Sequence, residues 1–222
     1  MRIVECEQGS VEWFEARRGI PTASGFSNLI TPSRGEPSKS MVPYIYQLLA
    51  EKYTGGCPVD IESYTSRAMQ DGIDMEPEAR RCYAFLAGGE EVREVGFCLS
   101  DDGRFGCSPD GLVGDDGGLE LKCPLPKTHI KYLVENQLPD EYKAQVHGSL
   151  IVTGRKWWDF MSYAHGLPEF RIRVEPDEFT DKLRECMAAF VAKFDATERQ
   201  IQGLGVELPE VPVDLETEEI IF

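Results

Sequence analysis

Two acidic residues and a lysine lie close together in the middle of the chain, in a spacing that suits metal-assisted hydrolysis. Asp110 precedes a short apolar run, and Glu120 and Lys122 belong to a second run after the sequence GDDGG. This glycine-rich sequence is typical of a turn, so the two runs predict a hairpin that returns Glu120 beside Asp110. Residues two apart in a strand share a face, so Glu120 and Lys122 project together and Leu121 is buried opposite. Such a set can hold a hard divalent cation and position an attacking water.

A surface hairpin with an ordinary solvated ion pair would contain the same residue types. The short turn favours the catalytic interpretation, as do the small residues Gly106, Cys107 and Ser108, which suit the close approach of a ligand. A serine nucleophile is disfavoured, because a Gly-x-Ser-x-Gly elbow would need glycine where Asp110 stands. The three histidines show no HExxH pattern, which disfavours a zinc hydrolase.

Hydrophobic periodicity, capping residues and turn residues predict an α/β fold with a mixed central sheet flanked by helices. A loop with two prolines, a glycine and Arg34 is expected over residues 31–38. Helices are expected over 10–18, 22–30, 40–53, 63–87, 139–152 and 178–202, and strands over 91–100, 104–107, 111–113, 119–123, 156–163 and 170–174.

The composition predicts one compact domain over residues 1–222 with a sizeable core, since 41% of the residues are hydrophobic. The formal net charge of −16 argues against a nucleic-acid enzyme, because phosphate contacts dominate DNA affinity. Basic residues nevertheless concentrate near the amino terminus and around the Asp110 motif. An acidic exterior therefore predicts weak binding to bulk DNA and dependence on capturing or threading an end.

The seven cysteines show no paired CxxC spacing, which predicts reduced thiols in a cytoplasmic protein and neither a disulfide framework nor a zinc site. No apolar run approaches the length of a membrane span, and the amino terminus lacks the pattern of a signal peptide. We therefore expect no membrane association.

The motif residues resemble a known nuclease family. Pro109-Asp110 with Glu120-Leu121-Lys122 resembles the PD-(D/E)xK motif, and CSPDGL with LELKCP resembles phage lambda exonuclease and its relatives. Four further segments agree in type and order: WFEARRG at 13–19, TAS at 22–24, GIDMEPEAR at 72–80 and YKAQV at 142–146. The resemblance runs over residues 8–165 and implies a restriction-endonuclease-like core there. The sequence pattern itself predicts a strand and helix over 166–205 and an acidic tail over 206–222.

The resemblance also implies roles for the acidic site. Asp110 and Glu120, with the Leu121 carbonyl, would hold one or two Mg²⁺ ions, for which Mn²⁺ would substitute. Lys122 would orient or help deprotonate the attacking water. Glu76 would lie near the metal, although a solvated ion pair with Arg80 on the same helix face would explain this residue equally simply. Gln145 would contact the metal-bound water or Lys122, although its ordinary reading is a buried hydrogen-bonding residue.

A second group of residues would bind the 5′-terminal phosphate. Arg17 is the better match to the arginine of the family that does so, with Arg18 as the alternative register, and Ser24 and Ser108 would add hydroxyl donors. A guanidinium with two hydroxyls suits a terminal phosphate. Arg34 could enter the DNA where the strands separate, although most loop arginines are merely solvated.

The activity implied is a Mg²⁺-dependent 5′→3′ exonuclease that acts on linear double-stranded DNA, releases mononucleotides and leaves 3′ overhangs. A trimeric ring, a single-strand annealing protein as partner, and phage-type recombination in a bacterial or prophage setting are also implied. A Cas4-like nuclease is disfavoured, because only Cys186 follows Cys123 and an iron–sulfur cluster would need more cysteines. A non-catalytic DNA-end-binding module would have lost an acid or the lysine, and all three are present.

Overall fold

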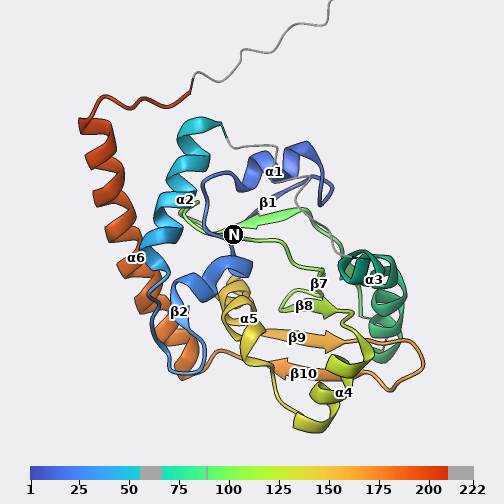
Figure 1. The fold of residues 1–222 in the computed structure, drawn as a ribbon. Coiled ribbons are helices and arrows are strands. Elements are labelled where there is room, and N and C mark those ends of the chain that lie inside the picture. Colours follow the sequence, from blue (N-terminus) through green and yellow to red (C-terminus); the bar gives the residue numbers. More distant parts are fainter. Residues whose placement is uncertain (56–66, 89, 210–222) are drawn as a thin grey trace, which may run out of the picture.

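The computed structural model describes residues 1–55, 67–88 and 90–209, without the side chains of residues 67–71 and 73 (Figure 1). Its elements in chain order are β1 (Arg2–Val4), α1 (Val11–Arg17), the 3₁₀ helix η1 (Ala23–Asn28), β2 (Ile30–Thr31), β3 (Glu36–Pro37), α2 (Met41–Thr54), α3 (Arg67–Leu86), β4 (Val92–Arg93), β5 (Phe97–Leu99), β6 (Gly106–Cys107), β7 (Gly111–Val113), β8 (Gly117–Lys122), α4 (Pro126–Glu135), α5 (Asp140–Thr153), β9 (Trp157–Ser162), β10 (Phe170–Val174) and α6 (Glu178–Gly203).

A five-stranded sheet in the order β10-β9-β8-β7-β4 forms the centre of the fold. Strands β8 and β9 are parallel, and every other neighbouring pair is antiparallel. The parallel pair requires a crossover, which α4 and α5 provide between β8 and β9. The mixed sheet with flanking helices confirms the predicted fold class.

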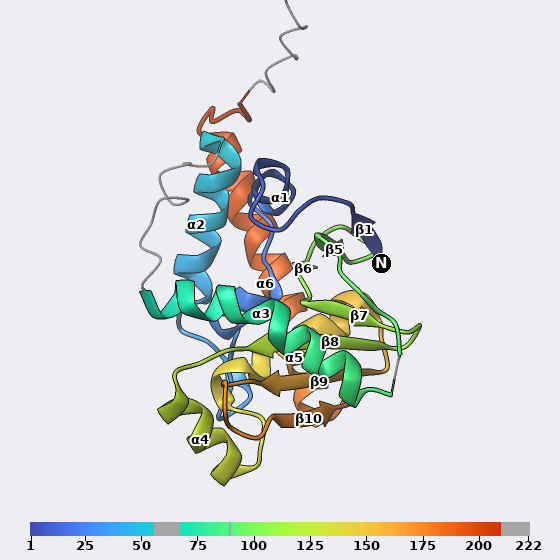
Figure 2. The ribbon, with the colours of Figure 1, turned by 90° about the vertical axis from the view of Figure 1, so that its right-hand side faces the viewer.

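The two faces of this sheet pack against different helices (Figure 1, Figure 2). The central strand β8 alternates, so that Leu119 and Leu121 join a small cluster with Ala79 and Tyr83 of α3. The larger core lies on the opposite face and includes α5, η1, α2 and α6. The strand that carries the motif is therefore held between α3 and α5.

Helix ends follow the signals in the sequence. Ser10 caps α1 by accepting a hydrogen bond from the Trp13 backbone, and Asp177 and Thr180 form a capping box at the start of α6. The inner face predicted for the helix near residues 40–53 is the buried face of α2. No helix within the described residues is both long enough and apolar enough to span a membrane.

The strand predicted over residues 91–100 is wrong as one element. It is divided into β4, which joins the central sheet, and β5, which joins a three-stranded sheet in the order β1-β5-β6. The division falls where Gly96 passes Cys6, since a Cβ at Gly96 would lie 2.2 Å from the Cys6 carbonyl oxygen. The close approach of the two backbones leaves no room for a regular strand with side chains.

Other expectations are also corrected. The helix over 22–30 is the single 3₁₀ helix η1, and the loop over 31–38 contains the short β2–β3 hairpin. Strand β1 and helix α4 are not among the predicted elements, because β1 is three residues long and α4 begins after Leu125 without a capping side chain. Residues 63–66 of one predicted helix, Cys57 and the tail from residue 210 lie outside the described residues.

Close packing of α5 against η1 generates a stability prediction. A Cβ at Gly148 would lie 2.3 Å from the Phe26 ring, and the Phe26 side chain is fully buried. Gly148→Ala should therefore destabilise the protein by about 1–3 kcal/mol in urea unfolding, as overpacked core sites do. Gly203→Ala is the matched helical control, since nothing lies within 4 Å of its added Cβ. Equal unfolding free energies for the two variants would contradict this packing.

Candidate active site

The β7–β8 hairpin places Asp110 directly beside the centre of β8. Gly111 pairs with Leu119, and the Asp110 backbone amide donates to the Leu119 carbonyl at 3.1 Å. The Leu121 backbone amide donates to Asp110 Oδ2 at 2.6 Å. The carboxylate of Asp110 is therefore fixed by the strand that carries the second acid.

Glu120 is the most enclosed acidic group of the site, with a side chain only 2% exposed. Two donors converge on its Oε1 atom: Lys122 Nζ at 2.5 Å and Gln145 Nε2, from α5, at 2.6 Å. Lys122 also lies over the Tyr142 ring, 5.4 Å from its centroid. The alternation of β8 thus brings Glu120 and Lys122 together on the α5 face, while Leu121 is buried on the α3 face.

Glu76 faces the same site from α3. Burial raises the pKa of Glu76, and the negative charge of Asp110 raises it further, while Lys122 and Arg80 lower it. Arg80, one helical turn later, donates from Nε to the Asp110 carbonyl at 3.2 Å. Helix α3 therefore contributes one acid and one cation to the surroundings of Asp110.

Burial dominates the electrostatics of the pair. It raises the pKa of Glu120 to about 7, with a further contribution from Asp110, and it also raises the pKa of Asp110. Burial lowers the pKa of Lys122, but Glu120 and Asp110 raise it by more, so its pKa lies above the ordinary value. The lysine is therefore held as an ammonium ion beside two carboxylates that are reluctant to ionise together.

The chemistry of these donors fits a hard divalent cation. Within the described residues, no three His, Cys, Asp or Glu side chains lie close enough to hold a metal ion by themselves. The carboxylates of Asp110 and Glu120, with Glu76 facing them from α3, provide oxygen donors only, as Mg²⁺ and Mn²⁺ prefer. The carbonyl of Leu121, which follows Glu120 in sequence, is a further oxygen donor. One buried and one half-buried acid that repel each other also favour a cation electrostatically.

A second cluster forms around Arg17 at the end of α1. Its guanidinium donates to Ser108 Oγ at 2.9 Å and to Thr22 Oγ1 at 3.3 Å, and Thr22 Oγ1 lies 3.2 Å from Ser24 Oγ. Trp13 Nε1 also donates to Ser108 Oγ at 2.9 Å, and the guanidinium lies 4.1 Å from the Trp13 ring centroid. The structure thus brings together Arg17, Ser24 and Ser108, which are distant in sequence.

Backbone pairing explains this convergence. Thr22 forms a parallel bridge with Gly106, whose amide donates to the Pro21 carbonyl at 3.1 Å. The chain after α1 is thereby joined to the strand that leads into Ser108 and Asp110. Sequence reasoning missed Thr22 and Trp13 as members of the cluster, although Trp13 stands four residues before Arg17 on the same helix.

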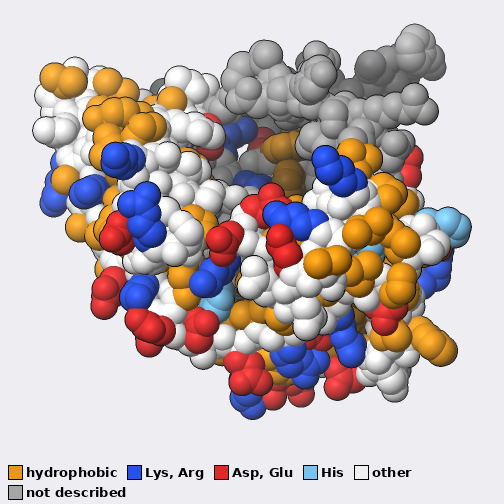
Figure 3. All heavy atoms as spheres, turned by 60° about the horizontal axis from the view of Figure 1, so that its bottom comes forward, with side chains coloured by type: hydrophobic (Ala, Val, Ile, Leu, Met, Phe, Trp, Pro, Cys, Tyr) orange, Lys and Arg blue, Asp and Glu red, His pale blue; other side chains and the backbone are white. Residues whose placement is uncertain are grey.

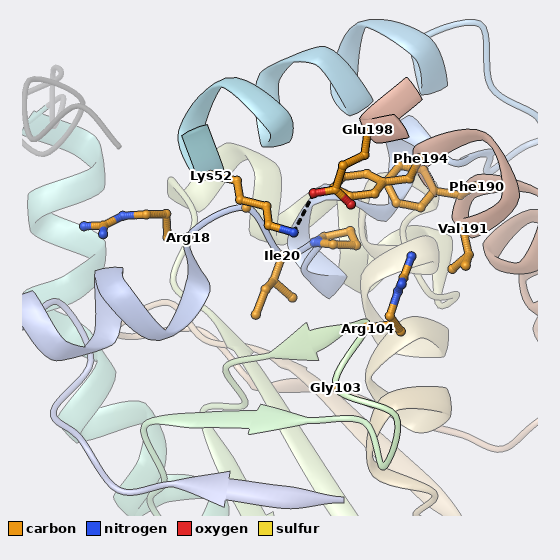
Figure 4. Close-up of a pocket in the computed structure, with 11 residues that line it drawn as sticks. Arg18, Ile20, Lys52, Gly103, Arg104, Phe190, Val191, Phe194 and Glu198 are labelled. Carbon is orange, nitrogen blue, oxygen red and sulfur yellow. Dashed lines mark hydrogen bonds and ion pairs between the residues drawn. The ribbon is translucent and has the colours of Figure 1, made fainter. Parts of the chain in front are cut away.

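Arg17 and Arg18 lie in different surroundings. Arg17 is enclosed, and burial lowers its pKa. Arg18 pairs with Glu15 at 3.9 Å. It also lines a cavity of about 300 Å³, whose wall includes the Lys52–Glu198 ion pair (Figure 4). Of the two arginines predicted as alternatives for phosphate binding, Arg17 contacts Ser108 and Arg18 pairs with Glu15 instead.

Arg34 is not gathered with the other candidate residues. It lies in the turn between β2 and β3, is 72% exposed and pairs with Glu36 at 3.9 Å. The neighbouring Gly35 lies against Lys182 of α6. Its role in DNA binding stays a prediction, since its contacts among the described residues do not reach the hairpin or the Arg17 cluster.

Basic and acidic side chains are interspersed over the hollowed face shown in Figure 3. The whole chain carries a formal net charge of −16. Affinity for bulk DNA depends on the number of neutralised phosphates, so a mixed surface favours recognition at a built site over general attraction.

Comparison with known structures defines the class of protein as exonuclease. Two structures of LHK-Exo, an alkaline exonuclease from Laribacter hongkongensis, are 34% identical to this chain over 88% of its length. The complex of LHK-Exo with dAMP gives a TM-score of 0.76 over 98% of that chain, and the other structure gives 0.70 over its full length. A phage-related exonuclease from Haemophilus somnus 129PT shares the fold, with a TM-score of 0.62 at 12% identity over 82% of this chain and 96% of that chain.

The YqaJ-like viral recombinase domain matches residues 12–156. The chain therefore belongs to the YqaJ-like viral recombinase family, which confirms the predicted relation to lambda-type exonucleases. No curated protein sequence matches the chain.

The raised pKa of Glu120 generates a prediction about stability and pH. A carboxyl whose pKa rises from 4.5 to about 7 on folding contributes stability below pH 4.5, and that stability is lost as the pH rises through 7. Without metal, the melting temperature of Glu120→Gln relative to the wild type should therefore increase between pH 5 and about 8. Any loss from the broken contacts to Lys122 and Gln145 is a constant offset.

Glu78→Gln is the control, because hydrogen bonds from Tyr163 and His165 lower the pKa of Glu78 from its ordinary value of 4.5. The stability contribution of Glu78 is lost only as the pH falls below 4.5, so the difference between Glu78→Gln and wild type should stay constant between about pH 5 and 8. The account of the buried pair is contradicted if the difference between Glu120→Gln and wild type does not change over this pH range.

Proposed function

We propose that this protein is a Mg²⁺-dependent 5′→3′ exonuclease that captures the end of linear double-stranded DNA. It would release mononucleotides from one strand and leave a 3′ overhang. The observation that carries the proposal is that the Arg17 cluster and the acidic site are joined by one short segment of chain. Ser108 accepts hydrogen bonds from Arg17 and Trp13, and Asp110 follows it by two residues. A terminal phosphate held at Arg17 would thus lie next to the acids.

The carboxylates of Asp110 and Glu120 would hold the metal, with the Leu121 carbonyl and Glu76 as further oxygen donors. When bound, Mg²⁺ supplies Lewis-acid polarisation of a phosphate and lowers the pKa of water. Gln145 fixes Glu120 by donating to Oε1, which limits rotation of the carboxylate. Lys122, held as an ammonium ion, would orient the attacking water and supply positive charge at the phosphate, with help in deprotonation only if its pKa falls in the complex.

The Arg17 cluster has the chemistry of a phosphate site. A guanidinium offers several donors in a fixed plane, and the Trp13 ring and the surrounding core hold that plane in place. The hydroxyls of Thr22, Ser24 and Ser108 can rotate to donate to phosphate oxygens. Because the guanidinium is poorly solvated, a charge-assisted bond to phosphate would be stronger there than at the surface.

The comparisons support the products and the context of the proposed reaction. LHK-Exo was crystallised with dAMP, a mononucleotide of the kind that stepwise cleavage of DNA releases. Membership of a viral recombinase family favours a role in recombination by strand annealing. We extend the proposal to a homotrimeric ring, a single-strand annealing partner and a cytoplasmic site of action in a bacterial or prophage setting, with residues 1–222 as one nuclease domain.

The proposal predicts a preference for 5′-phosphorylated ends that depends on Arg17 and not on Arg18. Arg17→Ala should reduce the ratio of initial rates on 5′-phosphate and 5′-hydroxyl duplexes by roughly 10- to 100-fold, the size of a charge-assisted contact. Arg18→Ala, which removes the same charge one residue away, should leave the ratio unchanged. The measurement uses matched linear duplexes with Mg²⁺, a closed circle as the substrate without ends, and EDTA or Asp110→Asn as the inactive state.

A wild-type enzyme that cuts the closed circle as fast as the linear duplex would contradict exonuclease action. Loss of the phosphate preference in Arg18→Ala alone would contradict the assignment of the pocket.

A further inference from the structure

The carbonyl of Asp110 has an unusual partner for a residue at the end of a strand. In the hairpin, the Leu121 backbone amide on β8 donates to the Asp110 side chain at 2.6 Å, so a carboxylate takes the place of a backbone acceptor. The Asp110 carbonyl instead accepts from Arg80 Nε at 3.2 Å. The Asp110 amide still donates to Leu119, so only the carbonyl lacks a partner on β8, and because an unpaired carbonyl at an enclosed site is costly, the bond from Arg80 stabilises this arrangement.

Arg80 is itself held in position. Its NH1 atom pairs with Glu94 at 2.8 Å, and its side chain is 22% exposed, while Glu94 is 68% exposed. Glu94 lies between β4 and β5, where the chain passes from the central sheet to the three-stranded sheet. The guanidinium therefore connects α3, the Asp110 carbonyl and the segment between the two sheets.

Helix α3 packs against β8, and this packing holds Arg80 in place beside Asp110 (Figure 2). One turn after Arg80, the Tyr83 hydroxyl donates to the buried carboxylate of Asp159 at 2.8 Å. Asp159 is also bound in bidentate form by Arg173. One turn before Arg80, Glu76 faces Asp110. The inner face of α3 thus carries Glu76 as a possible metal ligand, Arg80 as a cation and Tyr83 as the contact to β9, each about one helical turn apart.

We propose that Arg80 is a positioning residue that sets the carboxylate of Asp110 for metal binding. By holding the carbonyl of Asp110, it fixes the backbone rotation that points the side chain towards Glu120. Its action is through Asp110, and it makes no contact with DNA. The inference rests on the proposed function, since it concerns the same metal site.

The test uses Arg80→Ala, Arg80→Lys and Glu94→Gln, with Arg81→Ala as the matched control. Arg81 is the next residue on α3 and is exposed, so its removal changes the charge equally without touching the hairpin. Mn²⁺ binding is measured without DNA by electron paramagnetic resonance, DNA affinity is measured in Ca²⁺, and cleavage is measured in single turnovers against Mg²⁺ concentration. Circular dichroism and melting establish that each variant is folded.

Arg80→Ala should weaken Mn²⁺ binding by about 10- to 100-fold, as loss of a residue that orients a ligand does elsewhere. Its half-saturating Mg²⁺ should rise in parallel, while DNA affinity changes less than about twofold. Arg80→Lys should bind Mn²⁺ with an affinity between those of Arg80→Ala and wild type, because lysine keeps the charge but lacks the planar set of donors. Glu94→Gln should show a smaller change in the same direction, and Arg81→Ala none.

Two results would overturn the inference. Weaker DNA binding with unchanged Mn²⁺ affinity in Arg80→Ala would make Arg80 a phosphate contact. Unchanged Mn²⁺ affinity and unchanged half-saturating Mg²⁺ in Arg80→Ala, or wild-type values in Arg80→Lys, would show that the contacts of the Arg80 guanidinium with Asp110 and Glu94 do not position the metal ligand. If Arg80→Ala fails to fold, Arg80→Lys and Glu94→Gln decide on the same readouts. A wild-type protein without Mg²⁺-dependent cleavage would refute the proposed function instead.

Discussion

The enclosure of two carboxylates in one hairpin, with Glu120 buried and Asp110 half-buried, is the constraint on which the rest of this structure depends. An ionised carboxylate without partners is very costly to remove from water. Glu120, almost fully enclosed, is therefore bound by Lys122 and Gln145, while the Asp110 carboxylate accepts a backbone amide from β8. These contacts offset only part of the penalty, because the pKa of each acid remains raised. A divalent cation, as proposed, would offset more of this penalty.

The scaffold follows from this constraint. Strand β8 is held between α3 and α5, so that its alternate residues face a hydrophobic cluster and a polar site. The bridge between Thr22 and Gly106 brings the half-buried Arg17 to the same segment of chain that carries Asp110. In the proposed function, the acidic protein would recognise a negatively charged DNA end at this one cluster, and the mixed surface in Figure 3 would need no continuous basic area.

Much of the site could be predicted from local sequence. The turn sequence between two short apolar runs predicts the hairpin, and the two-residue period of a strand predicts that Glu120 and Lys122 share a face. Family resemblance was needed to associate Glu76, Gln145 and Arg17 with it, since those contacts join distant elements. The carbonyl contact of Arg80 had no signal in the sequence, because the acceptor is backbone. The split at Gly96 depends on the passage of Cys6, which is equally non-local.

Crystallographic placement of the metal tests the central claim most directly. Crystals of the wild-type protein with Mn²⁺ and a 5′-phosphorylated duplex, with data collected for the anomalous signal of manganese, would locate the ion without assumptions about activity. The account predicts an anomalous peak bound by carboxylate oxygens of both Asp110 and Glu120. A peak bound elsewhere, with both carboxylates still engaged only by protein donors, would contradict it.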